Sequence, residues 1–133
     1  MKAVDTNIVV RFLTGEDHPQ TAIARKVISD GDIFVCITVM LEAAWVLRSV
    51  YGFARSDVVR ALRAFAGLSG ITIEAPEMMA KALDRAAAGM DIADALHLGA
   101  AAQCDELLTF DRKFINAAEG GAMIVREPDQ AAL

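Results

Sequence analysis

The sequence predicts one α/β domain in which short, mainly parallel strands alternate with helices. Short apolar runs of strand length, such as residues 33–37 (IFVCI), alternate with longer segments in which apolar residues recur at helical spacing. The run at 33–37 is apolar throughout, which is typical of a strand covered on both faces of a parallel sheet. A length of 133 residues suits a single domain spanning 1–133, and the sequence contains no internal repeat or linker.

Turn and capping residues delimit the elements of the amino-terminal half. Thr6 or Asn7 can cap the helical turn that follows the first strand. Pro19 suits the first turn of a helix, which Gly31 ends, and Gly70 ends the last helix of this half. The predicted elements here are strands at 2–5, 33–37 and 71–74 and helices at 19–29, 38–51 and 58–68.

The carboxyl-terminal half shows the same alternation. Pro76 opens a helix that Gly89 ends, and Asp91 begins the next one. Two consecutive glycines at 120–121 form a turn before the last strand. From Glu127 the tail is polar and Ala-rich, and we expect it to fray. The predicted elements are helices at 76–85, 92–103 and 114–118 and strands at 107–110 and 123–125.

Composition narrows the class of protein. The hydrophobic fraction is 55%, but charge interrupts every apolar run before the roughly 18 residues that a membrane span needs. No signal peptide is apparent. Cys36 and Cys104 lie in apolar contexts and are expected to be buried free thiols, so we expect a cytoplasmic protein. The net charge of −5 argues against a surface that binds nucleic acid over its whole extent, although it leaves local binding open.

Acidic residues recur where strands end and helices begin. Asp5 ends the first strand, Glu42 lies one turn into the helix after the second, and Asp111 follows the fourth. Asp91 and Asp94 lie three residues apart in the first turn of a helix, so they share a face. In open α/β sheets, ligands bind outside the carboxyl ends of the strands where the strand order reverses. These acids are therefore candidates for one site.

Each acid also has a simpler interpretation. Asp5 and Asp91 can cap the helices that follow them, and Asp111 can belong to a surface turn. Glu42 and Asp94 differ because they lie inside apolar segments, where an unpaired buried carboxylate is costly. If the acids gather, their mutual repulsion requires a cation, and oxygen ligands favour Mg²⁺ or Mn²⁺. Such a site can support phosphodiester hydrolysis.

Four segments, in this order, carry a resemblance to a known family. They are VDTN at 4–7, IT at 37–38 with LEA at 41–43 and WVL at 45–47, DIADALHL at 91–98, and LTFDRKF at 108–114. Together they span nearly the whole chain. The sequence resembles the PIN-domain ribonucleases that serve as toxins in bacterial and archaeal VapBC toxin–antitoxin pairs.

The resemblance implies a PIN-like, three-layer α/β/α sandwich with a mainly parallel five-stranded sheet in the order 3-2-1-4-5. Strands one and four would then be neighbours, with Asp5 and Asp111 side by side. It also implies a metal-dependent endoribonuclease with Mg²⁺ or Mn²⁺ as cofactor. The implied catalytic and metal-binding acids are Asp5, Glu42, Asp94 and Asp111, and the supporting residues are Thr6, Asn7, Thr109 and Asp91.

Expected partners follow from the same resemblance. The substrate would be RNA, contacted mainly at its phosphates, and the cationic candidates are Arg11, Arg48, Arg112 and Lys113. The helices at 39–50 and 58–68 would form a groove for a cognate antitoxin, and another surface would form a homodimer. The aromatic content of 6% does not indicate a platform for base stacking. His97 is expected to be packed and hydrogen-bonded rather than a zinc ligand.

Other classes of protein remain as alternatives. The chain can be a PIN-like module that binds partners or RNA without cleaving. A phosphoacceptor signalling domain would need an acid at the end of the third strand, where Glu74 lies, and a lysine after the fifth, where the chain has Arg126. A dehalogenase-like phosphatase would need an aspartate two residues after the nucleophile, where the chain has Asn7.

Overall fold

The computed structural model describes residues 1–129, in which five short strands alternate with seven helices. The strands are β1 (Lys2–Ala3), β2 (Ile33–Val35), β3 (Ile71–Ile73), β4 (Glu106–Leu108) and β5 (Ile124–Arg126). The helices are α1 (Thr6–Thr14), α2 (Pro19–Asp30), α3 (Ile37–Ser49), α4 (Arg55–Ala66), α5 (Pro76–Ala87), α6 (Ile92–Ala100) and α7 (Arg112–Ala117). The predicted α/β class is confirmed, and residues 130–133 of the expected domain lie outside the described chain.

Helix boundaries follow the local chemistry, with small differences from the predictions. Asp5, rather than Thr6 or Asn7, caps α1, because its carboxylate accepts the Thr6 N–H at 2.7 Å. The first strand therefore ends at Ala3 and the helix starts at Thr6 itself. Helix α3 likewise starts before its expected cap, with Cys36 in the N-cap position.

The strands form two separate parallel sheets within the described chain. One has the order β1-β2-β3, and the other pairs β4 with β5. These are the two halves of the expected order 3-2-1-4-5, but the β1–β4 pairing that would join them into one five-stranded sheet does not form among residues 1–129. The parallel pairing within each sheet is as predicted, whereas the predicted pairing of β1 with β4 is wrong for the single chain.

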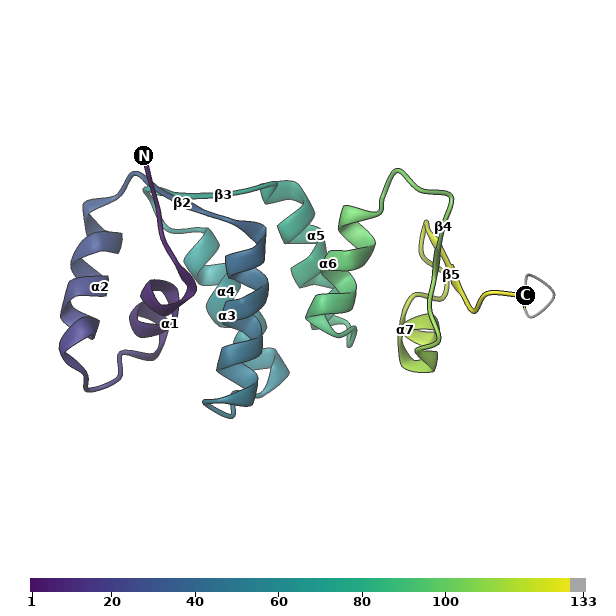
Figure 1. Cartoon of the computed structure of the whole chain (residues 1–133), viewed down its shortest axis with the longest axis horizontal. Coiled ribbons are helices and arrows are strands. Elements are labelled where there is room, and N and C mark those ends of the chain that lie inside the picture. The colour runs from purple at the N-terminus through teal and green to yellow at the C-terminus, as the bar shows by residue number, and fades with distance from the viewer. Residues whose placement is uncertain (130–133) are drawn as a thin grey trace.

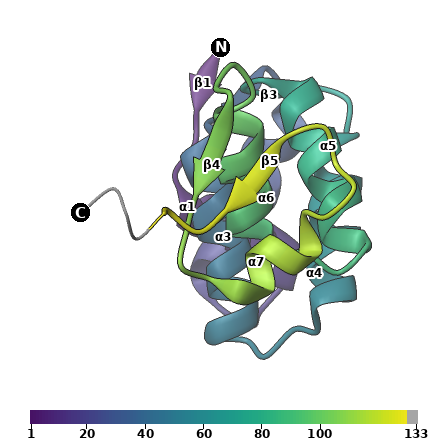
Figure 2. The same cartoon turned by 90° about the vertical axis from the view of Figure 1, so that its right-hand side faces the viewer.

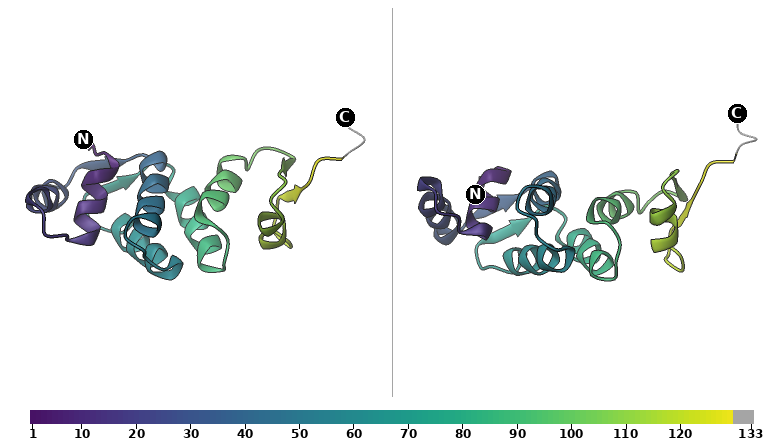
Figure 3. Two further views of the ribbon diagram at one scale, coloured as in Figure 1. Left: turned by 60° about the horizontal axis from the view of Figure 1, so that its bottom comes forward. Right: turned by 90° about the horizontal axis from the view of Figure 1, so that it is seen from below.

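The chain is elongated, and the two sheets lie toward opposite ends of it (Figure 1). Helix α1 packs on α2 and α3, and the helices from α3 to α6 then follow one another away from β1. After α6, residues 101–105 lead further in the same direction to β4, α7 and β5, which we call the C-terminal unit (residues 106–126). Seen end-on, this unit lies in front of α6 (Figure 2). Two further views show that it is separated from β1–β3 (Figure 3). The direction of the 101–105 segment is thus the physical reason that β4 does not reach β1.

Most of the hydrophobic core lies among helices α1 to α6 and the strands that they pack against. Phe65 of α4 is almost fully buried, and its ring lies 5.9 Å from that of Phe12 in α1, centroid to centroid. Both cysteines are free as expected, but Cys104 is exposed and Cys36 only partly buried, which corrects their expected burial. Among the described residues, no helix is both long and apolar enough to span a membrane.

Candidate functional site

A pocket of about 320 Å³ lies where α1 meets α3. Asp5 lies at its edge because β1 ends just before it and α1 begins just after it. The Asp5 side chain is exposed, and one carboxylate oxygen is bonded to the Thr6 N–H, which leaves the other oxygen available to a ligand. The pocket is lined by Asp5, Thr6, Asn7, Val10, Arg11, Glu42, Val46, Val50 and Tyr51.

A hydrogen bond between helices brings Glu42 to the same pocket. The hydroxyl of Thr6, only 7% exposed, donates to Glu42 Oε1 across the α1–α3 contact. A buried hydroxyl needs such a partner, because an unsatisfied polar group in the core destabilises the fold. Thr6 thus contacts both acids, Asp5 through its backbone N–H and Glu42 through its hydroxyl.

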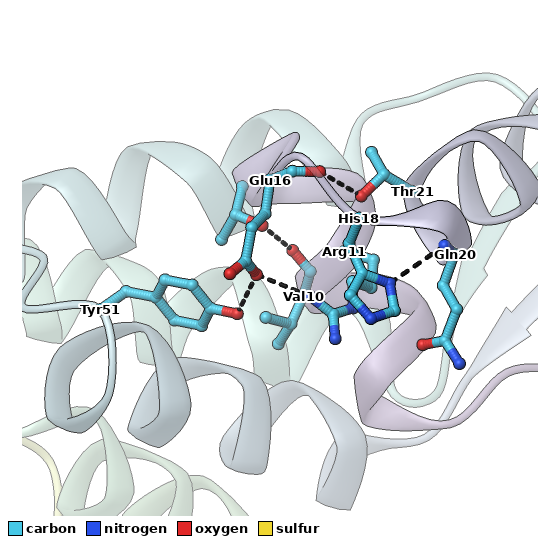
Figure 4. A network of polar contacts seen from close by, with 8 residues as sticks. Val10, Arg11, Glu16, His18, Gln20, Thr21 and Tyr51 are labelled. Atoms are coloured by element: carbon cyan, nitrogen blue, oxygen red, sulfur yellow. Dashed lines mark hydrogen bonds and ion pairs between the residues drawn. The ribbon is translucent and has the colours of Figure 1, made fainter.

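A second polar network, which sequence reasoning did not find, lies at the pocket wall. Glu16 Oε2 accepts a hydrogen bond from Tyr51 Oη at 2.7 Å and pairs with Arg11 Nη1 at 2.6 Å (Figure 4). The Glu16 hydrogen bond, burial and the Glu16 charge raise the pKa of Tyr51, and Arg11 opposes this rise. Thr21 holds the Glu16 backbone by donating to its carbonyl at 2.5 Å. No local pattern links Glu16 to Tyr51, which is 35 residues away.

Asp91 and Asp94 lie together at the start of α6. Asp91 is the N-cap, and its Oδ1 accepts the N–H groups of Ala93 at 2.9 Å and Asp94 at 3.2 Å. The Asp94 side chain is partly buried. Burial, followed by the charges of Asp91 and Asp111, raises the pKa of Asp94, while His97 lowers it. Asp94 thus carries the unfavourable charge that its apolar sequence context predicted.

Asp111 lies in the C-terminal unit, past the end of β4. It is exposed and caps α7, where its Oδ1 accepts the N–H groups of Lys113 at 2.9 Å and Phe114 at 3.3 Å. Thr109 Oγ1 accepts the Asp111 N–H at 3.0 Å. Thr109 therefore positions the backbone of Asp111 rather than its carboxylate.

The expected four-carboxylate cluster does not form within one chain. Asp5 and Glu42 share the pocket, whereas Asp94 and Asp111 are associated near α6. Across residues 1–129, no three histidine, cysteine or acidic side chains lie close enough to hold a metal ion. The reason is the missing β1–β4 pairing, which keeps Asp111 away from Asp5. The single chain therefore does not fit the metal that its acids suggest.

Comparison with known proteins identifies the family. The PIN domain family matches residues 2–120, which is most of the chain. The chain belongs to the PIN domain family. A search of curated proteins gave no match.

Membership brings a general chemistry to this PIN domain. PIN domains are generally nucleases, and those nucleases generally use divalent metal ions and act on nucleic acid. The match includes every acidic candidate from Asp5 to Asp111 and all strands except β5.

The cationic candidates of this PIN domain are dispersed. Arg11 lines the pocket, although Glu16 already neutralises part of its charge. Arg48 is exposed near the end of α3, Lys113 is exposed on α7, and Arg112 pairs with Glu127 at 3.2 Å. Only Arg11 of the four lines the pocket that holds Asp5 and Glu42.

His97 departs from the expectation of a packed histidine. Its side chain is exposed on α6. Its electrostatic interaction with Asp94, one turn earlier on α6, lowers the pKa of that carboxyl.

Proposed function

We propose that the protein is an endoribonuclease that depends on Mg²⁺ or Mn²⁺ and acts as the toxin of a toxin–antitoxin pair. The observation that carries the proposal is the pocket in which Asp5 and Glu42 converge within a chain of the PIN domain family. In this proposal the metal-binding acids are Asp5, Glu42, Asp94 and Asp111. Thr6, Asn7, Thr109 and Asp91 support them.

The residues of the pocket have distinct roles in this proposal. Thr6 holds Glu42 through their hydrogen bond, and one oxygen of each carboxylate is not engaged by Thr6 and can bind a ligand. Arg11 at the wall supplies a positive charge for an RNA phosphate. Arg48, Arg112 and Lys113 would contact phosphates outside the pocket, because their side chains are exposed.

Exposed apolar residues support a protein partner of the antitoxin kind. On α3, Trp45 is 62% exposed, and Val50, just past its end, is 66% exposed. Contiguous exposed apolar patches mark interaction surfaces, and Trp45 and Val50 are candidates for parts of such a surface. Phe65, on the second helix of the expected groove, is buried in the core and does not contribute to this surface. A cytoplasmic location and a homodimer complete the proposal.

Purified protein without antitoxin should cleave RNA in the presence of Mg²⁺ or Mn²⁺, and EDTA should stop the cleavage. Asp5→Asn and Glu42→Gln should each abolish cleavage, because each removes a charge from the pocket. Asn retains the helix cap at position 5, so the fold should persist. Glu77→Gln, an exposed glutamate of α5, is the matched control and should cleave at the wild-type rate.

A module that binds without cleaving is the second candidate, and one observation favours it. Within a single described chain the four acids are not brought together. Under that alternative, the wild-type protein would bind RNA or its partner but leave every RNA intact at all metal concentrations. That result would overturn the nuclease proposal.

A further inference from the structure

The outer strands of both sheets have an open edge, and two of them, β1 and β4, lie just before Asp5 and Asp111. β1 pairs with β2 on one side, and β4 pairs with β5 on one side, with no strand on the other side within residues 1–129. Lys2 and Val4 donate to β2 and its preceding residue, so the backbone groups of Ala3 face away from the sheet. In the same way Thr109 donates to Arg126, so the backbone groups of Leu108 face the open side of β4.

Apolar side chains are exposed at the carboxyl end of β4, just past it, and on the adjacent β5. Leu108 is 50% exposed, Phe110 is 82% exposed, and Ile124 of the adjacent β5 is 59% exposed. An exposed strand edge with apolar side chains is a template for pairing with another strand. The segment 108–110 contains neither a charge nor a proline, and the one charged residue of β4, Glu106, is paired with Arg126 of β5.

The C-terminal unit has its own internal connections. Arg126 binds Glu106 through two hydrogen bonds, Nη2–Oε1 at 2.7 Å and Nε–Oε2 at 2.9 Å, which join β5 to β4. Helix α6, in contrast, is fixed to α5: a Cβ atom at Gly99 would lie 2.6 Å from Met78 Cγ. The segment 101–105 therefore connects a body that ends at α6 to a unit that extends beyond it (Figure 1).

The acids are divided between the same two parts. Asp5 directly follows the open strand β1, and Asp111 follows the open strand β4 at the other end of the chain. A second copy of this chain can supply a β4 edge to β1 of the first copy and a β1 edge to its β4. One reciprocal exchange would therefore pair the open edges of β1 and β4 in both chains and leave β3 and β5 as the outer strands, which a different protein could not do with a single strand.

We propose that two copies exchange their C-terminal units, so that β4 of one copy pairs in parallel with β1 of the other and places Asp111 beside Asp5 and Glu42 of that copy. The resulting sheet has the order 3-2-1-4-5, with strands from two chains. The role of Asp111 in the combined site rests on the proposed function, whereas the strand exchange does not. A complete site then requires the dimer.

Mixed inactive variants test whether the site is shared between copies. Asp5→Asn and Asp111→Asn should each be inactive alone, and Asn preserves both helix caps. When the two are unfolded, mixed in equal amounts and refolded, random pairing makes half of the dimers mixed, each with one intact site, so about a quarter of wild-type cleavage should return. If the wild type cleaves RNA and the mixture recovers nothing, the shared site is overturned.

Cross-linking tests the strand exchange without requiring activity. In a Cys36→Ser/Cys104→Ser background, one chain carries Ala3→Cys and a tagged chain carries Leu108→Cys. A short thiol cross-linker should join the mixed chains into a covalent heterodimer, and a chain with both substitutions should give covalent dimers. An internally cross-linked monomer, or a monomeric mass in solution, would overturn the exchange even if RNA cleavage is observed. Glu77→Cys in place of Leu108→Cys is the control, because it is exposed on α5 and should give no specific product.

Discussion

Asp5 and Asp111 have the same structural role at the ends of two different strands. Each follows a short parallel strand, β1 or β4, and each caps the helix that comes next by accepting backbone N–H groups. Capping uses one carboxylate oxygen in each case. Capping, the simpler interpretation of Asp5, is therefore correct, whereas Asp111 caps a helix instead of lying in the expected surface turn; each keeps a second oxygen for a further role.

The cap at Asp5 should contribute measurably to stability. Asp5→Ala removes the acceptor for the first N–H of α1, and we expect the free energy of unfolding to fall by about 1 kcal/mol. Asp5→Asn keeps an acceptor and should cost only a few tenths of that amount. Urea denaturation of both variants measures the difference. Asp17→Ala, in the exposed loop before α2, is the control, and an equal loss in all three would contradict the capping role.

Tyr51 should titrate above its ordinary pKa of 10.0, because its hydroxyl donates to the Glu16 carboxylate. It is the only tyrosine in the chain, so the ultraviolet absorbance of tyrosinate reports it alone. Glu16→Gln should lower the midpoint toward the ordinary value, because it removes the negative charge that opposes ionisation. An unchanged midpoint would mean that the contact does not persist in solution. Glu77→Gln, remote from the pocket, should leave the titration unaltered.

Replacing Gly70 should lower the stability of the fold more than replacing most other glycines. Its φ is +85°, and a Cβ atom there would lie 2.8 Å from the Gly31 Cα, in the backbone just before β2. Gly70→Ala should therefore destabilise the fold by roughly 1–3 kcal/mol, since backbone strain and the steric clash add. Gly52 also has a positive φ, of +71°, but open space around it. Gly52→Ala should cost less, and equal losses in thermal unfolding would exclude the close approach as the cause.

Local signals in the sequence predicted the elements well, because helix starts and stops depend on nearby residues. Pro19 and Pro76 begin α2 and α5 as predicted. Asp94 was expected to be an unfavourable acid from its apolar neighbours, and its partial burial and raised pKa agree with this.

Relationships over long distances in the sequence were less predictable. The expected contact of β1 with β4 came from the family resemblance, and no residue within either strand specifies its partner across about a hundred positions. The direction taken by residues 101–105 decides the pairing, because this segment leads from α6 away from β1. The Glu16–Tyr51 contact was missed for the same reason: neither residue has a local pattern that indicates the other.

Without bound metal, Asp94 should limit stability at neutral pH. Because the folded state raises the pKa of Asp94 above 3.8, chiefly through burial, folding favours the protonated carboxyl. The folded state then binds more protons than the unfolded state, so stability falls as pH rises from about 3.8 through the higher folded pKa, and the full penalty remains above that window. Asp94→Asn should therefore raise the melting temperature at pH 7 and have little effect at the acidic end of the window. The gain should be modest, because the side chain is only partly buried and water screens its charge. Asp17→Asn, an exposed acid, should show no such pH-dependent difference, and the same gain at every pH would rule out charge as the cause.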